Sequence, residues 1–225
     1  MASSGNSEDE PLGLDEAYAV ETPDDNRRLY AKWAGSYDTD FIDANGYVYH
    51  ENVVGIFLDA GGGAGGAVLD VGCGTGVVGV ALGDLGEATV DGVDISREML
   101  DVAATKTTCH GTAAYRNLIE ADLTDHLGLA DDMYSGIISV GTFTHGHLGP
   151  NALDELVRVA APSAAAAIGI NAQHYVERGF DRWFADRSAA GDITSPTLVS
   201  VTIYEAMDGE HAGDRANVAV FQVLR

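Results

Sequence analysis

Three glycines at alternate positions, Gly72, Gly74 and Gly76, lie between two apolar runs in the middle of the chain. The run before them, residues 67–71, is short enough for a buried strand, and the run after them, residues 77–82, is typical of a helix. Glycine lets a chain turn sharply and lets a ligand approach the backbone closely. A helix that begins after such a turn has free N–H groups in its first turn. This stretch therefore predicts a cradle for a cofactor.

The spacing of the cradle fits two classes of cofactor. Gly74, Gly76 and Gly79 form G-x-G-x-x-G, and Asp94 follows about 20 residues on, which is the fingerprint of a dinucleotide site such as one for NAD. Counted from Asp70, the same stretch forms D-x-G-x-G-x-G. The second pattern is the more specific of the two, because it fixes an acidic residue together with three glycines.

The next expected strand, residues 89–94, ends in an acidic residue, Asp94. A carboxylate accepts hydrogen bonds through several lone pairs and donates none, so it suits the two hydroxyl groups of a ribose. Asp91 is the weaker candidate, because the alternation of a strand points it to the other face. Ser96 is the expected N-cap of a helix over residues 97–105.

Two histidines, His145 and His147, follow the fourth expected strand, residues 134–140. Imidazole titrates near neutral pH, so we expect either histidine to be able to take a proton from a substrate. No third ligand stands at a typical spacing from this His-x-His pair, so we predict no metal site. Cys73 has no marked base beside it and is expected to fill space in the glycine loop.

These residues must be positioned by alternating strands and helices. The further expected elements are strands at residues 117–123, 164–171, 197–206 and 217–224, and helices at residues 27–34, 47–58, 152–159 and 174–187. This alternation predicts a parallel sheet with helices on both faces. Ligands of such sheets bind beyond the carboxyl ends of the strands, where the acidic residues and the histidines stand.

The composition limits the classes of partner that the chain can bind. The chain has 225 residues, which is one domain by default, and a formal net charge of −23 with only two lysines. Such a chain repels a phosphate backbone and an anionic membrane surface, so we expect neither nucleic acid nor membrane as a partner. No apolar run of about 18 residues exists, and two cysteines form no disulfide framework. These features predict a cytoplasmic protein.

Four motifs together resemble those of the class I S-adenosylmethionine-dependent methyltransferases. They are D-x-G-x-G-x-G at residues 70–76, Y-x-x-W-A-x-x-Y-D at residues 30–38, D-I-S-x-E-M-L at residues 94–100 and G-T-F-T-H-G-H at residues 141–147. The last three are similar to those of the group related to the Williams–Beuren syndrome region methyltransferase-like protein. The resemblance implies an α/β fold with a Rossmann-like sheet of seven strands, mostly parallel with the last strand antiparallel, and helices on both faces.

The resemblance also implies S-adenosylmethionine as the cofactor and assigns its binding residues. Asp122 and Leu123 match the acidic and apolar pair that meets adenine, with Glu120 and Asp125 as alternatives. Tyr37 matches the ligand-facing member of an N-terminal helix that closes over the cofactor. The complete implied set is Tyr37, Asp70, Gly72, Gly74, Gly76, Asp94, Ile95, Met99, Asp122, Leu123 and Gly141.

The expected activity is direct in-line methyl transfer to a small-molecule acceptor by a monomer or homodimer. The alternatives are a non-catalytic S-adenosylmethionine-binding regulator and an NAD-dependent oxidoreductase. A short-chain dehydrogenase needs a Tyr-x-x-x-Lys pair, and the residues four before the two lysines are Arg28 and Val102. The expected organisation is a disordered acidic segment (residues 1–14) and one domain, made of a helical lid (15–60), a cofactor-binding core (67–171) and a substrate-side helix with a closing hairpin (172–225).

Overall fold

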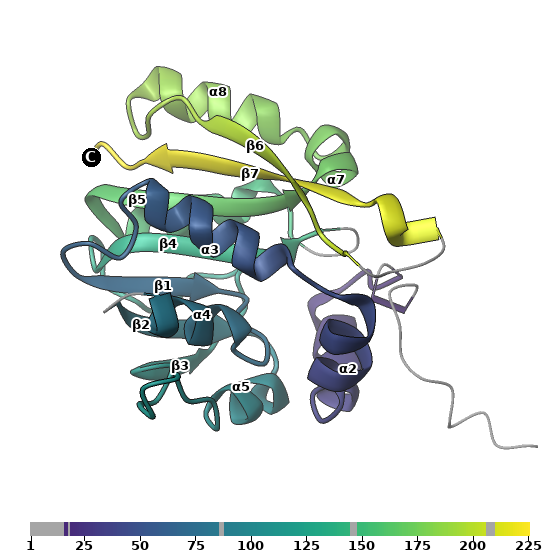
Figure 1. The fold of residues 1–225 in the computed structure, drawn as a ribbon. Helices are drawn as coiled ribbons and strands as arrows, with labels where there is room; N and C mark the ends of the chain where they lie inside the picture. Colours follow the sequence, from purple (N-terminus) through teal and green to yellow (C-terminus); the bar gives the residue numbers. More distant parts are fainter. Residues whose placement is uncertain (1–15, 18, 86–87, 145–147, 206–209) are drawn as a thin grey trace, which may run out of the picture.

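A seven-stranded sheet runs through the computed structural model, which describes residues 16–17, 19–85, 88–144, 148–205 and 210–225. The segment expected to be disordered, residues 1–14, lies outside the described residues. The strands are β1 (Ala67–Val71), β2 (Thr89–Asp94), β3 (Asn117–Glu120), β4 (Tyr134–Phe143), β5 (Ala160–Asn171), β6 (Thr197–Thr202) and β7 (Arg215–Gln222). Their order in the sheet is β3-β2-β1-β4-β5-β7-β6 (Figure 1).

The strand directions match the expected sheet. Strands β1 to β5 pair in parallel, whereas β7 pairs antiparallel with both β5 and β6. The chain passes from β1 to β2 and β3 on one side and to β4 and β5 on the other, so the strand order reverses between β1 and β4. A crevice opens beyond the carboxyl ends of the strands at such a reversal. The predicted mostly parallel sheet with an antiparallel last strand is confirmed.

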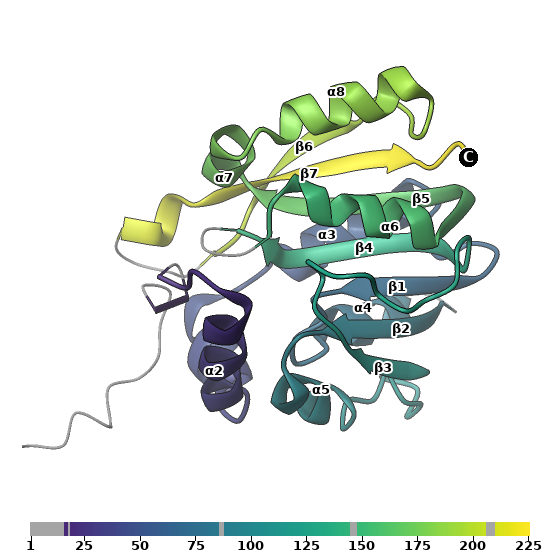
Figure 2. The ribbon, with the colours of Figure 1, turned by 180° about the vertical axis from the view of Figure 1, so that it is seen from behind.

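Helices cover both faces of this sheet. They are α2 (Pro23–Trp33), α3 (Tyr49–Asp59), α4 (Val77–Leu85), α5 (Arg97–Ala103), α6 (Leu153–Val159), α7 (Ala172–Glu177) and α8 (Phe180–Ala190), with a π-helical turn η1 (Asp38–Asp43) and two short 3-10 turns, η2 (Pro150–Ala152) and η3 (Glu210–Gly213). Helices α3 and α4 lie on one face and α6 and α8 on the other (Figures 1 and 2). Helix α2 stands beyond the carboxyl ends of the parallel strands (Figure 1).

The alternation of β1 divides the core into two layers. Val68 packs with Phe57 of α3 on one face, while Leu69 packs with Leu153 of α6 and Phe184 of α8 on the other. These five side chains are at most 2% exposed, so both faces of the strand are covered. Burial of apolar surface at roughly 25 cal/mol per Å² stabilises both layers and holds the glycine loop that follows β1 in place.

Several element boundaries differ from those expected. Helix α2 begins at Pro23 and not at residue 27, because Thr22 and Asp25 form a capping box. The third strand ends at Glu120, since the side chain of Asp122 turns back to accept the N–H of Thr124 at 2.9 Å. The fifth strand begins earlier than expected, directly after α6.

The helix expected over residues 174–187 is two helices, α7 and α8. Gly179 lies between them with φ +73°, a left-handed conformation that interrupts a helix and that glycine adopts without strain. Among the helices that the structure describes, none has the length and apolar character that crossing a membrane requires.

Candidate cofactor and acceptor sites

A hollow of about 780 Å³, its open mouth included, lies at the carboxyl ends of the parallel strands, and residues of α2 form part of its lining. It is lined by Pro23, Asn26, Tyr30, Tyr37, Tyr47, Gly72, Gly74, Asp94, Ile95, Met99, Asp122, Leu123, Thr124, Val140, Gly141, Thr142 and Leu148. Every predicted cofactor residue except Asp70 and Gly76 is in this set. The sequence motifs therefore come together in one place, which we call the cofactor hollow.

The glycine loop forms the floor of the cofactor hollow. Gly72 and Gly74 both have positive φ, at +68° and +52°. A Cβ on Gly72 would lie 2.0 Å from Oγ1 of Thr142, so that position admits only glycine. A Cβ on Gly74 would meet nothing within 4 Å and would enter open space. The loop thus exposes its backbone to the hollow at Gly74 and packs closely against the β4 end at Gly72.

Asp94 is held in place by backbone donors. The Gly74 N–H donates to its Oδ2 and the Ser96 N–H donates to its Oδ1, each at 2.9 Å. Burial raises the pKa of the Asp94 carboxyl, and these two donors partly oppose the rise. Each carboxylate oxygen retains a second lone pair. Asp94 is thereby oriented to accept two further hydrogen bonds, as a ribose diol would donate.

The loop after β3 supplies the opposite wall. Oδ1 of Asp122 accepts from Oγ1 of Thr124 at 2.6 Å, while Arg27 of α2 approaches its Oδ2 at 3.4 Å. Leu123, beside it, is buried and also lines the hollow. The alternatives lie elsewhere: Glu120 faces Arg97, and Asp125 is not among the lining residues.

Ile95 and Met99 complete an apolar wall with Leu123. Ser96 caps α5, as expected, by accepting the N–H of Met99 at 3.3 Å, and this fixes the first turn that carries Met99. Asp91, the weaker ribose candidate, lies outside the hollow. Its carboxylate accepts from Arg116 in a pair that lowers the pKa of Asp91.

Asp70 and Gly76 lie behind the loop and do not line the hollow. Asp70 is 1% exposed, and its Oδ2 accepts from the hydroxyl of Tyr115 at 2.7 Å. Burial raises the pKa of Asp70 to about 7. A Cβ on Gly76 would lie 3.0 Å from the ring of Tyr115, so this glycine gives the ring room. Tyr115 also accepts the N–H of Gly79 at 3.0 Å, which ties Asp70 to α4.

Some lining residues were not predicted from the sequence. Asn26 of α2 is one, and its buried Oδ1 has no hydrogen-bond partner among the described residues. Tyr47, between η1 and α3, is another. No local spacing marks either residue, because both reach the hollow only when the N-terminal segment packs over the loop. The histidines proposed as bases, His145 and His147, lie outside the described residues.

A second hollow adjoins the first and shares Tyr30, Tyr37, Tyr47 and Gly141 with it. Its volume, with the open mouth included, is about 510 Å³. The remaining lining residues are Ala17, Trp33, Phe41, Tyr49, Phe143, Thr144, Asn171, Ile203 and Tyr204. We call it the aromatic hollow. Tyr37 stands in the wall between the two hollows, where the predicted aromatic face of the N-terminal segment places it.

The chemistry of the cofactor hollow fits S-adenosylmethionine. Asp94, Asp122 and the unpartnered Asn26 Oδ1 are hydrogen-bond acceptors, and the ribose and amino groups of this molecule are donors. The glycine loop and Asp94 alone would also suit a dinucleotide, but no Lys or Arg is among the described lining residues to pair with its pyrophosphate. The described residues also contain no cluster of three or more His, Cys, Asp and Glu side chains able to hold a metal ion.

Comparisons with known proteins found similarity to methyltransferases. Residues 68–163 match a family model described as a methyltransferase domain. The chain is similar to the methyltransferase GfsG of Streptomyces halstedii, with 35% identity over 107 residues, which are 47% of this chain. The match spans only 37% of that relative's length.

Two solved structures share the fold. The cyclase SpnF superposes with a TM-score of 0.64 and 12% identity over 91% of this chain and 98% of its own. A geranyl diphosphate methyltransferase, solved with GPP and sinefungin, gives a TM-score of 0.56 and 15% identity over 77% of each chain. The fold is the Rossmann-like fold of class I methyltransferases. The matched domain and its relative support a class I S-adenosylmethionine-dependent methyltransferase.

Proposed function

We propose that this protein transfers a methyl group from S-adenosylmethionine to a small-molecule acceptor. The observation that carries the proposal is the contact between the two hollows, which share Tyr37, Tyr47 and Gly141. A cofactor in one hollow and an acceptor in the other meet at this shared wall. Holding two reactants in line within about 3 Å supplies most of the acceleration that such a reaction needs.

The described residues divide the work between them. Asp94 binds the ribose, Ile95, Met99 and Leu123 enclose the adenine, and Asp122 accepts from its amino group. Helix α2 and the segment through Tyr47 act as the lid of the cofactor hollow. S-adenosylmethionine, when bound, supplies an electrophilic methyl group on a sulfonium sulfur.

With S-adenosylmethionine bound, a lone pair of the acceptor would form the new bond to the methyl carbon, and the electrons of the broken carbon–sulfur bond would stay on sulfur. An acceptor that carries a proton at the reacting atom must lose it. His145 and His147, which follow Thr144 of the aromatic hollow in the sequence, are the proposed bases. Three motifs of the chain are similar to those of the Williams–Beuren-related group, which supports a relationship of this chain to that group.

The proposed methyl transfer is tested by measuring the production of S-adenosylhomocysteine. Purified protein is incubated with S-adenosylmethionine and separate panels of phenols, carboxylic acids, amines and thiols. We expect acceptor-dependent S-adenosylhomocysteine from one panel and its loss in Asp94→Ala. Tight binding of the cofactor without turnover in any panel would instead favour a regulatory binding protein. The measurement must detect the product, because a protein with this fold is named a cyclase, so the fold alone does not define methyl transfer.

A further inference from the structure

The wall of the aromatic hollow is built of rings from segments far apart in the sequence. Trp33 of α2 packs against Tyr37 with ring centroids 4.9 Å apart and against Phe41 of η1 at 5.3 Å. Phe41 in turn packs against Tyr47 at 5.6 Å and against Tyr204, after β6, at 6.0 Å. Each ring is held by its neighbours in edge or tilted contact, so the wall is a fixed aromatic surface.

This wall carries no formal charge. None of the described residues that line the aromatic hollow is Asp, Glu, Lys or Arg. Burial raises the pKa of Tyr37 and of Tyr47 well above its ordinary value, so both hydroxyls stay protonated at physiological pH. A charged ligand would lose its hydration here and would contact no opposite charge among the described lining residues, and that loss is costly.

Besides the hydroxyl groups of its tyrosines, the lining includes two residues with side-chain N–H groups, Trp33 and Asn171. Trp33 is 2% exposed, and its Nε1–H, which can only donate, has no hydrogen-bond partner among the described residues. Asn171 uses its Oδ1 to accept the N–H groups of Gln173 and His174, which leaves the Nδ2 group of the amide as the part available to a ligand. An oxygen that accepts a hydrogen bond complements both donors.

We propose that the aromatic hollow binds the acceptor and selects a neutral, planar, conjugated molecule. Its ring system stacks on the aromatic wall, and an oxygen atom accepts a hydrogen bond from Nε1 of Trp33. The inference rests on the proposed function, because the hollow meets the cofactor hollow at Tyr37 and Tyr47.

The chain contains two tryptophans, and they form a matched pair of reporters. Trp33 lines the aromatic hollow, whereas Trp183 lies in α8 and donates from Nε1 to Asp154 at 2.8 Å. Protein labelled with 5-fluorotryptophan gives one fluorine resonance from each. The variants Trp33→Phe and Trp183→Phe assign the two resonances. The four probes are compared on the unsubstituted chain, so that comparison does not depend on the folding of a variant.

The probes share one shape and differ in one property. With S-adenosylhomocysteine bound, as verified by calorimetry, the protein is titrated with 2-naphthol, decahydro-2-naphthol, 2-naphthyl phosphate and trimethyl(2-naphthyl)ammonium. We expect 2-naphthol to shift the Trp33 resonance alone and to bind about tenfold more tightly than the saturated or charged probes. We also expect Trp33→Phe to weaken 2-naphthol binding about fivefold, since it removes one hydrogen bond, and Trp183→Phe to leave it unchanged.

Three results would overturn the inference. One is equal or tighter binding of the cationic probe, as a cation–π cage would give. Another is equal binding of the saturated alcohol, and a third is no shift of the Trp33 resonance by 2-naphthol. If S-adenosylhomocysteine binds while these results are obtained, only the inference about the acceptor is wrong. If S-adenosylhomocysteine itself fails to bind, the proposed function fails and the inference falls with it.

Discussion

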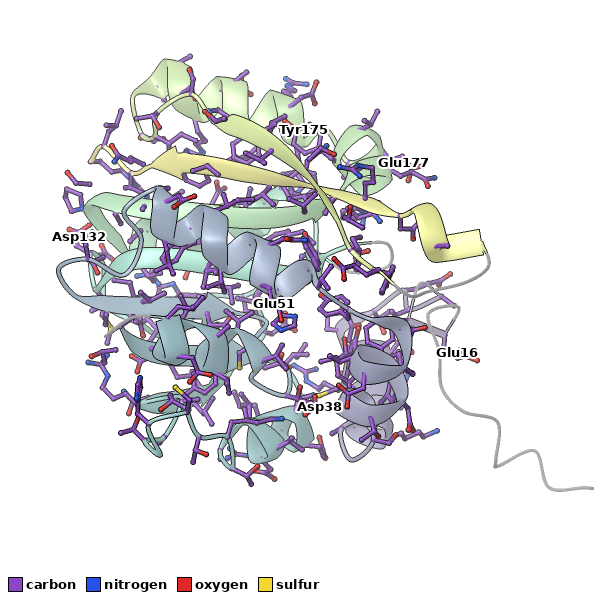
Figure 3. The ribbon with its side chains drawn as sticks, in the orientation of Figure 1. Glu16, Asp38, Glu51, Asp132, Tyr175 and Glu177 are labelled. Carbon is purple, nitrogen blue, oxygen red and sulfur yellow. The ribbon has the colours of Figure 1, made fainter. Side chains whose placement is uncertain are left out.

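Thr75, in the glycine loop, donates a hydrogen bond from Oγ1 to Oδ1 of Asp38 at 2.5 Å, across 37 residues of sequence. Lys106, just after α5, pairs with the other oxygen of the same carboxylate. Asp38 begins η1 and follows Tyr37, and Figure 3 shows it on the side of the molecule where α2 faces α5. This carboxylate therefore connects the segment that carries Tyr37 to the floor of the cofactor hollow.

Replacing Asp38 with Asn tests whether this connection supports cofactor binding. The amide keeps the size of the side chain, but its Nδ2 cannot pair with the Lys106 ammonium. We expect the Kd for S-adenosylhomocysteine to rise about three- to tenfold, because the pair is partly exposed and contributes roughly 1 kcal/mol. Calorimetry measures this change. Asp43→Asn, an exposed position in the same turn, is the matched control, and equal Kd values in the two variants would refute the connection.

Asp70 should make folding stability depend on pH. Because burial raises its pKa to about 7 in the folded protein, the folded state binds the proton more tightly than the unfolded chain. The contribution of protonated Asp70 to the free energy of unfolding is therefore fully present below about pH 4. It is lost as the pH rises to about 7. Urea unfolding at pH 5 and pH 8 measures it. Asp70→Asn should lose less stability than the wild type between these values, by ~1–3 kcal/mol. An unchanged difference would contradict the raised pKa.

Gly79 makes room for the ring that binds Asp70. An added Cβ would lie 2.3 Å from the Tyr115 ring, so Gly79→Ala must displace that ring. We expect Gly79→Ala to lower the free energy of unfolding by about 2 kcal/mol. Gly55→Ala in α3 is the control, because its Cβ meets nothing within 4 Å and it should stabilise the helix by roughly 0.5–1 kcal/mol. Denaturant unfolding measures both, and destabilisation of equal size would contradict this packing argument.

The sequence predicted the part of the site that is local. Gly72, Gly74, Asp94 and Asp122 stand at or just after the ends of strands, and parallel strands bring their carboxyl ends to one edge. Apolar alternation and glycine spacing therefore located Gly72, Gly74 and Asp94, whereas Asp122 came from the resemblance to the methyltransferases. The same patterns predicted seven strands, and the resemblance to the methyltransferases predicted that the last one is antiparallel.

The rest depends on contacts that no spacing records. Asn26 and Tyr47 line the cofactor hollow because the N-terminal segment folds over the loop, which is a tertiary event. The resemblance also implied that Asp70 binds the cofactor. In the fold, its carboxylate accepts a hydrogen bond from the hydroxyl of Tyr115, 45 residues away. Side-chain direction at a strand end is set by packing on both sides of the loop and is not readable from the motif.

In the proposed function, S-adenosylmethionine binds in the cofactor hollow through Asp94. Calorimetric titration of S-adenosylhomocysteine into the wild type, Asp94→Ala and the exposed α5 variant Asp101→Ala tests it most directly, with thermal melts to verify folding. We predict micromolar binding by the wild type and Asp101→Ala, and a loss of about 30-fold or more in Asp94→Ala, because two hydrogen bonds to a carboxylate are removed. Equal affinity in all three proteins, or binding of NAD in place of S-adenosylhomocysteine, would contradict the claim.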